Sequence, residues 1–64
     1  MNPNYPATLI AMTLTKGQVS YKFEVERAQV KVTTLEGPKS YTETLAPEEA
    51  QALWHRLATI GFKA

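Results

Sequence analysis

A chain of 64 residues can build one domain with a small hydrophobic core, and 44% of its residues are hydrophobic, an ordinary share for a folded protein. Its seven basic and six acidic residues leave a formal net charge of +1, which is too balanced to imply binding to nucleic acid or a membrane by overall charge. The sequence has no cysteine, which excludes disulfide bonds within the chain.

The N-terminal residues 1–6 are predicted to form an arm, because Pro3 and Pro6 interrupt strand pairing. Between residues 7 and 45 several segments have apolar residues at every second position, most clearly residues 18–26, which is the pattern of β-strands. This region is expected to form most of the fold.

The first hairpin is predicted to join a strand over residues 7–15 to a strand over residues 18–26. A two-residue turn at Lys16-Gly17 would connect them and bring both apolar sets onto one face. The pairs that this turn predicts are Leu14 with Val19, Met12 with Tyr21 and Ile10 with Phe23.

The third strand is predicted over residues 28–35. Apolar positions change from odd to even numbers between the second and third strands, so the connection is either a tight turn at residues 26–27 or a bulge in one long bent strand. The tight turn would place Phe23 across from Val30 on the apolar face.

The fourth strand is predicted over residues 40–45, after a strong turn signal at residues 36–39. It is short, and its sequence does not fix its register.

Two orientations of this fourth strand are open. Either Tyr41 and Leu45 face the core, with Glu43 at the rim, or Thr42 and Thr44 face inward. An inward charge at an edge protects against edge-to-edge aggregation. We prefer the first orientation, because Leu45 then lies where it can pack on the start of the helix.

A helix is predicted over residues 47–60. Pro47 suits the first turn, and the two glutamates that follow lie at the positive end of the helix dipole. Gly61 is expected to end the helix in a left-handed conformation, with Phe62 folding back on Leu57. Its apolar face comprises Ala50, Leu53, Trp54, Leu57 and Ile60.

These elements predict an α+β fold, in which an antiparallel four-stranded or three-stranded meander carries one C-terminal helix across one face. We expect residues 1–64 to form a single domain with an arm (1–6), a meander (7–45) and a helix (47–60). The expected core comprises Met12, Tyr21, Phe23, Val30, Val32, Leu53, Trp54 and Leu57.

The residue inventory argues against catalysis. The chain has no cysteine, no aspartate and one histidine, His55. Nucleophilic triads and multi-ligand metal sites need residue types that are absent or scarce here. We therefore expect no enzymatic activity, no metal site and no cofactor, with His55 solvated on the flank of the helix.

The sheet face away from the helix is the candidate interaction surface. Lys22 and Lys31 are predicted to lie directly opposite each other there, either as an anion contact or as two solvated amines offset by Glu24. Ala11→Lys would add a third positive charge to their row and favour the monomer. The predicted surface comprises Leu9, Ala11, Thr13, Lys22, Lys31, Thr33 and Leu35.

The expected function is a small binding module that self-associates, most simply as a dimer, or binds another protein through the exposed sheet face or an edge strand. The alternatives are a single-stranded nucleic-acid-binding protein and a small inhibitor of a larger enzyme. No stretch has the pattern of a signal peptide or approaches the ~20 apolar residues of a membrane span, so we expect a cytoplasmic protein without a membrane partner.

Four strands followed by a helix that opens with Pro47-Glu48 resemble, in the order of elements, the single-stranded-DNA-binding transcriptional coactivators. The resemblance implies nucleic-acid binding but carries no functional residue across. Such proteins stack bases on exposed aromatic side chains in a basic groove. Here Tyr21, Phe23 and Trp54 are predicted to face the core, and the basic residues are dispersed.

Overall fold

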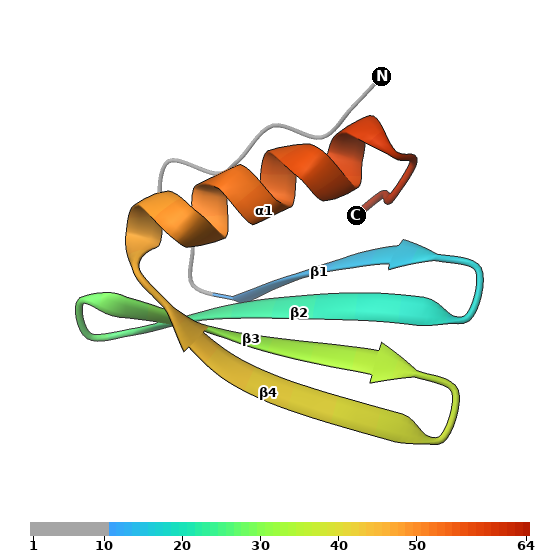
Figure 1. Cartoon of the computed structure of the whole chain (residues 1–64), viewed down its shortest axis with the longest axis horizontal. Coiled ribbons are helices and arrows are strands. Elements are labelled where there is room, and N and C mark those ends of the chain that lie inside the picture. The colour runs from blue at the N-terminus through green and yellow to red at the C-terminus, as the bar shows by residue number, and fades with distance from the viewer. Residues whose placement is uncertain (1–10) are drawn as a thin grey trace.

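The structure is a computed structural model that describes residues 11–64. The strands form one antiparallel sheet in chain order, with β1 and β4 at its edges, and a helix follows them (Figure 1). The predicted α+β meander is confirmed, and its fourth strand pairs. The predicted arm and the start of the first strand lie outside the described residues. The elements are β1 (Ala11–Lys16), β2 (Val19–Glu26), β3 (Gln29–Glu36), β4 (Lys39–Leu45) and α1 (Pro47–Thr59).

Three two-residue loops connect the strands, and each begins with a residue in the left-handed region. The φ angles are 62° at Gly17, 60° at Arg27 and 59° at Gly37. Positive φ at the first loop residue alone is the pattern of a type II′ turn, whose twist matches that of the flanking strands. The connection between β2 and β3 is therefore a tight turn, and the bulge is excluded.

The strand register differs from the prediction by two residues, because the first two turns lie one residue later than expected. Leu14 lies across from Tyr21, and Phe23 lies across from Met12 on one side and Val32 on the other. The pairing of Leu14 with Val19 and that of Phe23 with Val30 are therefore wrong. Side chains in a strand alternate with period two, so this shift leaves the same residues facing the helix.

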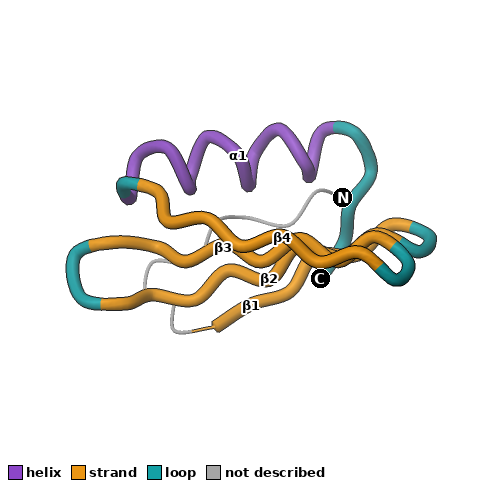
Figure 2. Tube along the Cα trace, turned by 60° about the horizontal axis from the view of Figure 1, so that its bottom comes forward, coloured by secondary structure: helices purple, strands orange, loops and turns teal. Residues whose placement is uncertain are grey.

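The helix packs on one face of the sheet, and no other described element covers the opposite face (Figure 2). Phe23 and Trp54 are both 0% exposed, and their rings meet edge to face with centroids 5.2 Å apart. Five residues of the predicted core are buried, and the other three, Met12, Tyr21 and Leu53, are partly buried against them. Ile60, predicted on the apolar face of the helix, is 52% exposed, whereas Ala58 is buried. The buried cluster comprises Leu14, Phe23, Val30, Val32, Ala50, Trp54, Leu57 and Phe62.

Both helix ends are closed by hydrogen bonds. At the start, the Ala46 N–H donates to the Glu49 carboxylate at 3.2 Å. At the end, the Phe62 N–H donates to the Leu57 carbonyl at 2.9 Å. Gly61 has φ of +110°, and its N–H donates to the Ala58 carbonyl at 3.2 Å. This is the Schellman cap that the sequence predicts.

Candidate interaction surface

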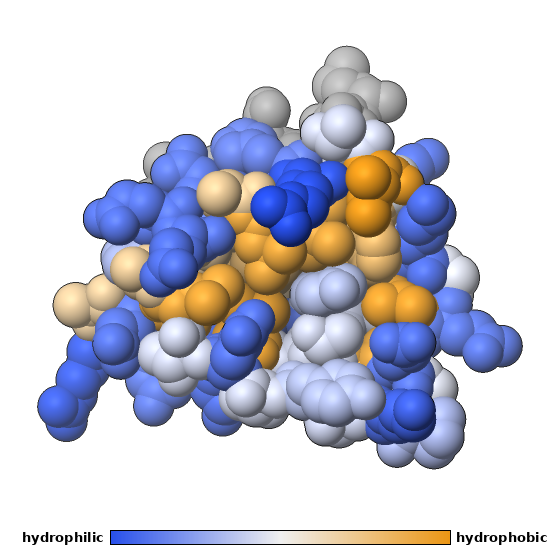
Figure 3. Space-filling view, in the orientation of Figure 1, coloured by the Kyte–Doolittle hydropathy of each residue, from blue (hydrophilic) through white to orange (hydrophobic). Residues whose placement is uncertain are grey.

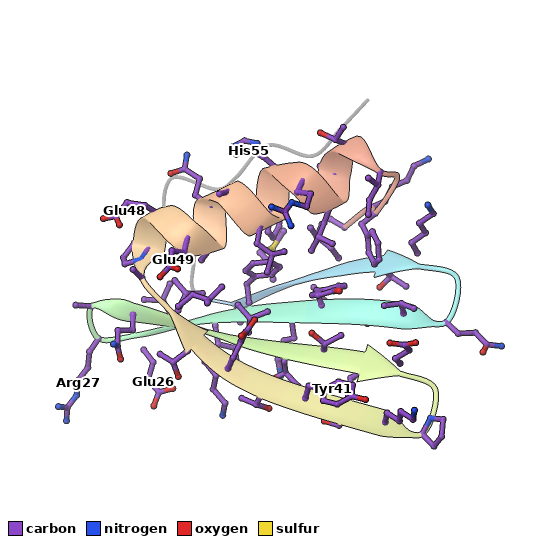
Figure 4. The ribbon with its side chains drawn as sticks, viewed as in Figure 1. Glu26, Arg27, Tyr41, Glu48, Glu49 and His55 are labelled. Atoms are coloured by element: carbon purple, nitrogen blue, oxygen red, sulfur yellow. The ribbon has the colours of Figure 1, made fainter. Side chains whose placement is uncertain are left out.

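Residues 11–64 contain no pocket and no group of three side chains that could hold a metal ion. His55 lies exposed on α1 (Figure 4). Among the described residues, no helix has the length and apolar character needed to cross a membrane. The candidate site that the sequence predicts is a surface of the sheet.

The outer face of the sheet is the side away from α1. Six of the residues predicted to form the interaction surface lie there, since they alternate along the strands with residues that face the helix. Leu9 lies outside the described residues. The six are Ala11, Thr13, Lys22, Lys31, Thr33 and Leu35.

The predicted opposition of Lys22 and Lys31 is wrong. Lys22 lies across from Thr33, and Lys31 lies across from Glu24. The two lysines are diagonal neighbours. The residue across from Lys31 is Glu24 and not Lys22, as the prediction had it. The row that contains Ala11 holds Glu24 and Lys31, so a lysine at position 11 would face a glutamate rather than extend a row of positive charge.

Small hydroxyl side chains dominate the outer face. The Thr33 and Thr42 Oγ1 atoms lie 3.4 Å apart, and the Thr15 Oγ1 and Ser20 Oγ atoms are separated by the same distance. Leu35, 44% exposed, is the one large hydrophobic side chain of residues 11–64 that this face exposes. A face of this kind is well solvated and gains little from burying apolar area.

The two edges of the sheet are not equivalent. On the β1 edge, the Thr15 N–H donates to the Lys63 carbonyl at 2.8 Å, and the Lys63 N–H donates to the Thr15 carbonyl at 3.0 Å. The Lys16 ammonium donates to the carbonyl of Ile60 at 2.6 Å, next to the helix end. The C-terminal residues therefore pair with β1 and close part of its edge. No periodic pattern in the sequence predicts this pairing.

The β4 edge is open along the strand. β4 has seven residues and, among the described elements, pairs with β3 alone. In an antiparallel strand, each residue directs both its N–H and its C=O toward the same side of the strand, and the next residue directs them toward the opposite side. Lys39 flanks the two-residue turn and bonds back toward Glu36 across it. The outward groups therefore belong to Ser40, Thr42 and Thr44.

The β1 edge supports this assignment of the outward groups. There Lys16 flanks the first turn, and Thr15, one residue further from the turn, is the residue that points both backbone groups outward, to Lys63. Ser40 occupies the equivalent position in β4. Thr42 and Thr44 follow it with the same parity.

The side chains of β4 on the helix side confirm the preferred orientation. Tyr41 lies across from Thr34, and Glu43 lies across from the buried Val32. Tyr41 nevertheless remains 55% exposed. Figure 4 places it on β4, beyond the part of the sheet that α1 covers. In Figure 3, apolar atoms gather in a band beside the helix, and more polar residues cover the β4 side.

We define the β4 edge as Lys39, Ser40, Tyr41, Thr42, Glu43 and Thr44. From the sequence, edge strands are expected as a class of binding site and Glu43 is expected at the rim of the sheet, but none of these residues is predicted to bind a partner. A usable signal is present: the Gly37-Pro38 turn fixes which residues of the following strand point their backbone groups outward.

No protein-family model matches the chain, and neither a curated protein nor a solved structure matches it.

Proposed function

We propose that this protein is a non-enzymatic interaction module that binds its partner by strand addition at the β4 edge. The observation that carries the proposal is the contrast between the two edges. The C-terminal residues pair with β1, whereas no described element pairs with the outward backbone groups of Ser40, Thr42 and Thr44. An added strand would satisfy these groups, at roughly 0.5–1.5 kcal/mol for each hydrogen bond formed.

The composition of the surfaces favours the edge over the outer face. The outer face has few apolar side chains, so stacking on it would bury hydroxyl and charged groups for little hydrophobic gain. It also presents no aromatic platform for bases within residues 11–64, because Tyr21 and Phe23 face the helix. Strand addition depends on backbone groups and does not require an apolar face.

The test compares Thr42→Pro with Thr42→Ala. Because the Thr42 N–H points away from β3, proline at this position removes no bond of the sheet but blocks an incoming strand. Alanine leaves the backbone donor in place. Proteins captured by the immobilised wild-type chain should be captured by Thr42→Ala and lost with Thr42→Pro, while both variants keep cooperative unfolding.

Hydrogen exchange provides a second readout of the same proposal. Binding of a captured partner should slow exchange of the Ser40, Thr42 and Thr44 amides and leave the amides of the central strand β2 unchanged. Capture that survives Thr42→Pro, or protection confined to other elements, would contradict strand addition at β4.

A further inference from the structure

We propose that the partner strand at this edge is β4 of a second copy of the same chain, paired antiparallel about a two-fold axis that passes beside Tyr41. The inference rests on the proposed function and names its partner. The product is one continuous sheet of two meanders, with both helices on the same face.

Charge complementarity carries the inference. Lys39 lies two residues before Tyr41, and Glu43 lies two residues after it. Antiparallel pairing about Tyr41 therefore sets each Lys39 across from Glu43 of the other copy, and it does so twice by symmetry. All three side chains lie on the helix side of β4, where no described residue buries them. Two copies of residues 39–43 therefore have complementary charges when they pair antiparallel.

The backbone pattern fits the same register. Pairing about Tyr41 brings Ser40 across from Thr42 of the second copy, and both residues point their backbone groups outward. Two such pairs exchange about four hydrogen bonds. Tyr41 then faces Tyr41 of the second copy at a non-hydrogen-bonded position, where cross-strand side chains approach most closely.

Other two-fold registers leave a mismatch. An axis at Thr42 sets Glu43 against Tyr41 and leaves Lys39 against an apolar side chain. An axis at Glu43 sets two carboxylates against each other, which is unfavourable. An axis at Ser40 sets Pro38, which has no N–H, across from Thr42, whereas the axis at Tyr41 moves Pro38 to the end of the ladder, across from Thr44.

The proposed dimer would also cover the part of β4 that lies on the helix side of the sheet and that α1 leaves exposed. Because paired residues of antiparallel strands share a face, the two helices lie on one side of the joined sheet, each over its own meander. The strip between them is the part of β4 that α1 leaves uncovered. Tyr41, 55% exposed in the single chain, would be covered there by its symmetry mate.

The experiment reverses each charge in a separate protein. Lys39→Glu alone and Glu43→Lys alone each create two like-charge pairs in the proposed dimer. We expect each variant to raise the dimer dissociation constant about tenfold relative to wild type in sedimentation equilibrium. The interface is small, so the measurement should span roughly 10 µM to 1 mM chain.

Mixing the two variants is the decisive step. In the mixture, the carboxylate at substituted position 39 faces the amine at substituted position 43, and native Glu43 faces native Lys39. Affinity should therefore return to near the wild-type value as a heterodimer, which a mass tag on one variant identifies. Lys39→Glu also faces Glu36 within its own hairpin, but a folding defect would not be rescued by mixing.

Ala11→Lys is the matched control, since it adds a charge to the outer face of the other edge strand. It should leave the dissociation constant unchanged, and a shift to monomer would overturn pairing at β4 in favour of stacking through the outer face.

Failure of the mixture to recover affinity would overturn the register. A folded wild type that stays monomeric at about 1 mM would overturn self-pairing, whereas capture sensitive to Thr42→Pro would still support the proposed function.

Discussion

Arg27 adopts a backbone conformation that costs free energy. Its φ is 60°, and the residues at the equivalent position of the other two loops are glycines. The left-handed region brings the Cβ of an L-residue close to its own backbone, at about 1–2 kcal/mol. The hairpin geometry requires positive φ there, so the sheet maintains a conformation that the residue itself does not favour.

We predict that Arg27→Gly raises the free energy of unfolding by about 0.5–1 kcal/mol, because relief of the unfavourable φ exceeds the extra chain entropy of glycine. Arg27→Lys, which keeps the charge and the Cβ, should leave it unchanged. Urea denaturation measures both variants. A midpoint for Arg27→Gly at or below that of the wild type would show that the left-handed conformation carries no cost at this position.

Single residues were predictable where periodicity and size agreed. Phe23 and Trp54 were expected in the core and are fully buried. Ile60 has the same helical spacing but is half exposed, because it lies at the C-cap where the chain turns away toward Lys63. Phe62 takes a place in the buried cluster beyond the helix end, and its ring meets Tyr21 with centroids 5.3 Å apart.

At the scale of the element, the end of α1 depends on one glycine. Gly61 has φ of +110°, beyond the range that L-residues readily adopt. A Cβ at this position would meet the Lys16 side chain at 3.5 Å, an ordinary contact distance, so the cost of a side chain is in the backbone. We predict that Gly61→Ala lowers the free energy of unfolding by roughly 1 kcal/mol.

The control for this prediction replaces Gly61 with D-alanine in a synthetic chain. The D-residue prefers positive φ, so it should retain at least the wild-type stability while adding the same number of atoms. Thermal or urea denaturation distinguishes the two alanines. Equal midpoints for both would assign the effect to bulk instead of to backbone conformation.

The hairpins show why the faces of the sheet were predictable and the register was not. Alternation with period two fixes which side chains face the helix, and moving a turn by one residue shifts the pairing by two without changing either face. The first loop was assigned to Lys16-Gly17 and is Gly17-Gln18. The second includes Arg27 at its strained position, which no turn preference indicates.

The same two-residue shift in register separates the two lysines of the candidate anion contact. Lys22 and Lys31 are a candidate anion contact only in the predicted register, which sets them opposite each other. The observed register instead sets Lys31 across from Glu24. The β4 edge could not be predicted as the open edge for a different reason. Which edge is open follows only from the strand order and from the pairing of Lys63 with β1.

At the scale of the whole molecule, the difference between the two edges would limit the proposed assembly to a dimer. One open edge can pair once about a two-fold axis, which closes the assembly at a dimer. Two open edges permit alternating pairing and unlimited growth, the hazard that natural sheets avoid by covering an edge. In this chain the cover on β1 includes two backbone hydrogen bonds between Thr15 and Lys63.

We predict that Lys63→Pro opens the β1 edge. Proline cannot donate the 3.0 Å hydrogen bond from position 63 to the Thr15 carbonyl, a loss of about 0.5–1.5 kcal/mol. With the β4 edge still able to pair, the variant should form assemblies larger than a dimer in sedimentation velocity at about 100 µM chain. Lys63→Ala retains both backbone groups and should match the wild type in size.

The double variant Lys63→Pro/Thr42→Pro separates the contributions of the two edges. With β4 blocked, pairing at β1 alone should close after one step, so large assemblies should disappear while the loss of stability remains. Large assemblies that persist in the double variant would place the association outside both edges. A Lys63→Pro variant that is destabilised but no larger than Lys63→Ala would show that the C-terminal pairing holds the helix end in place without controlling assembly.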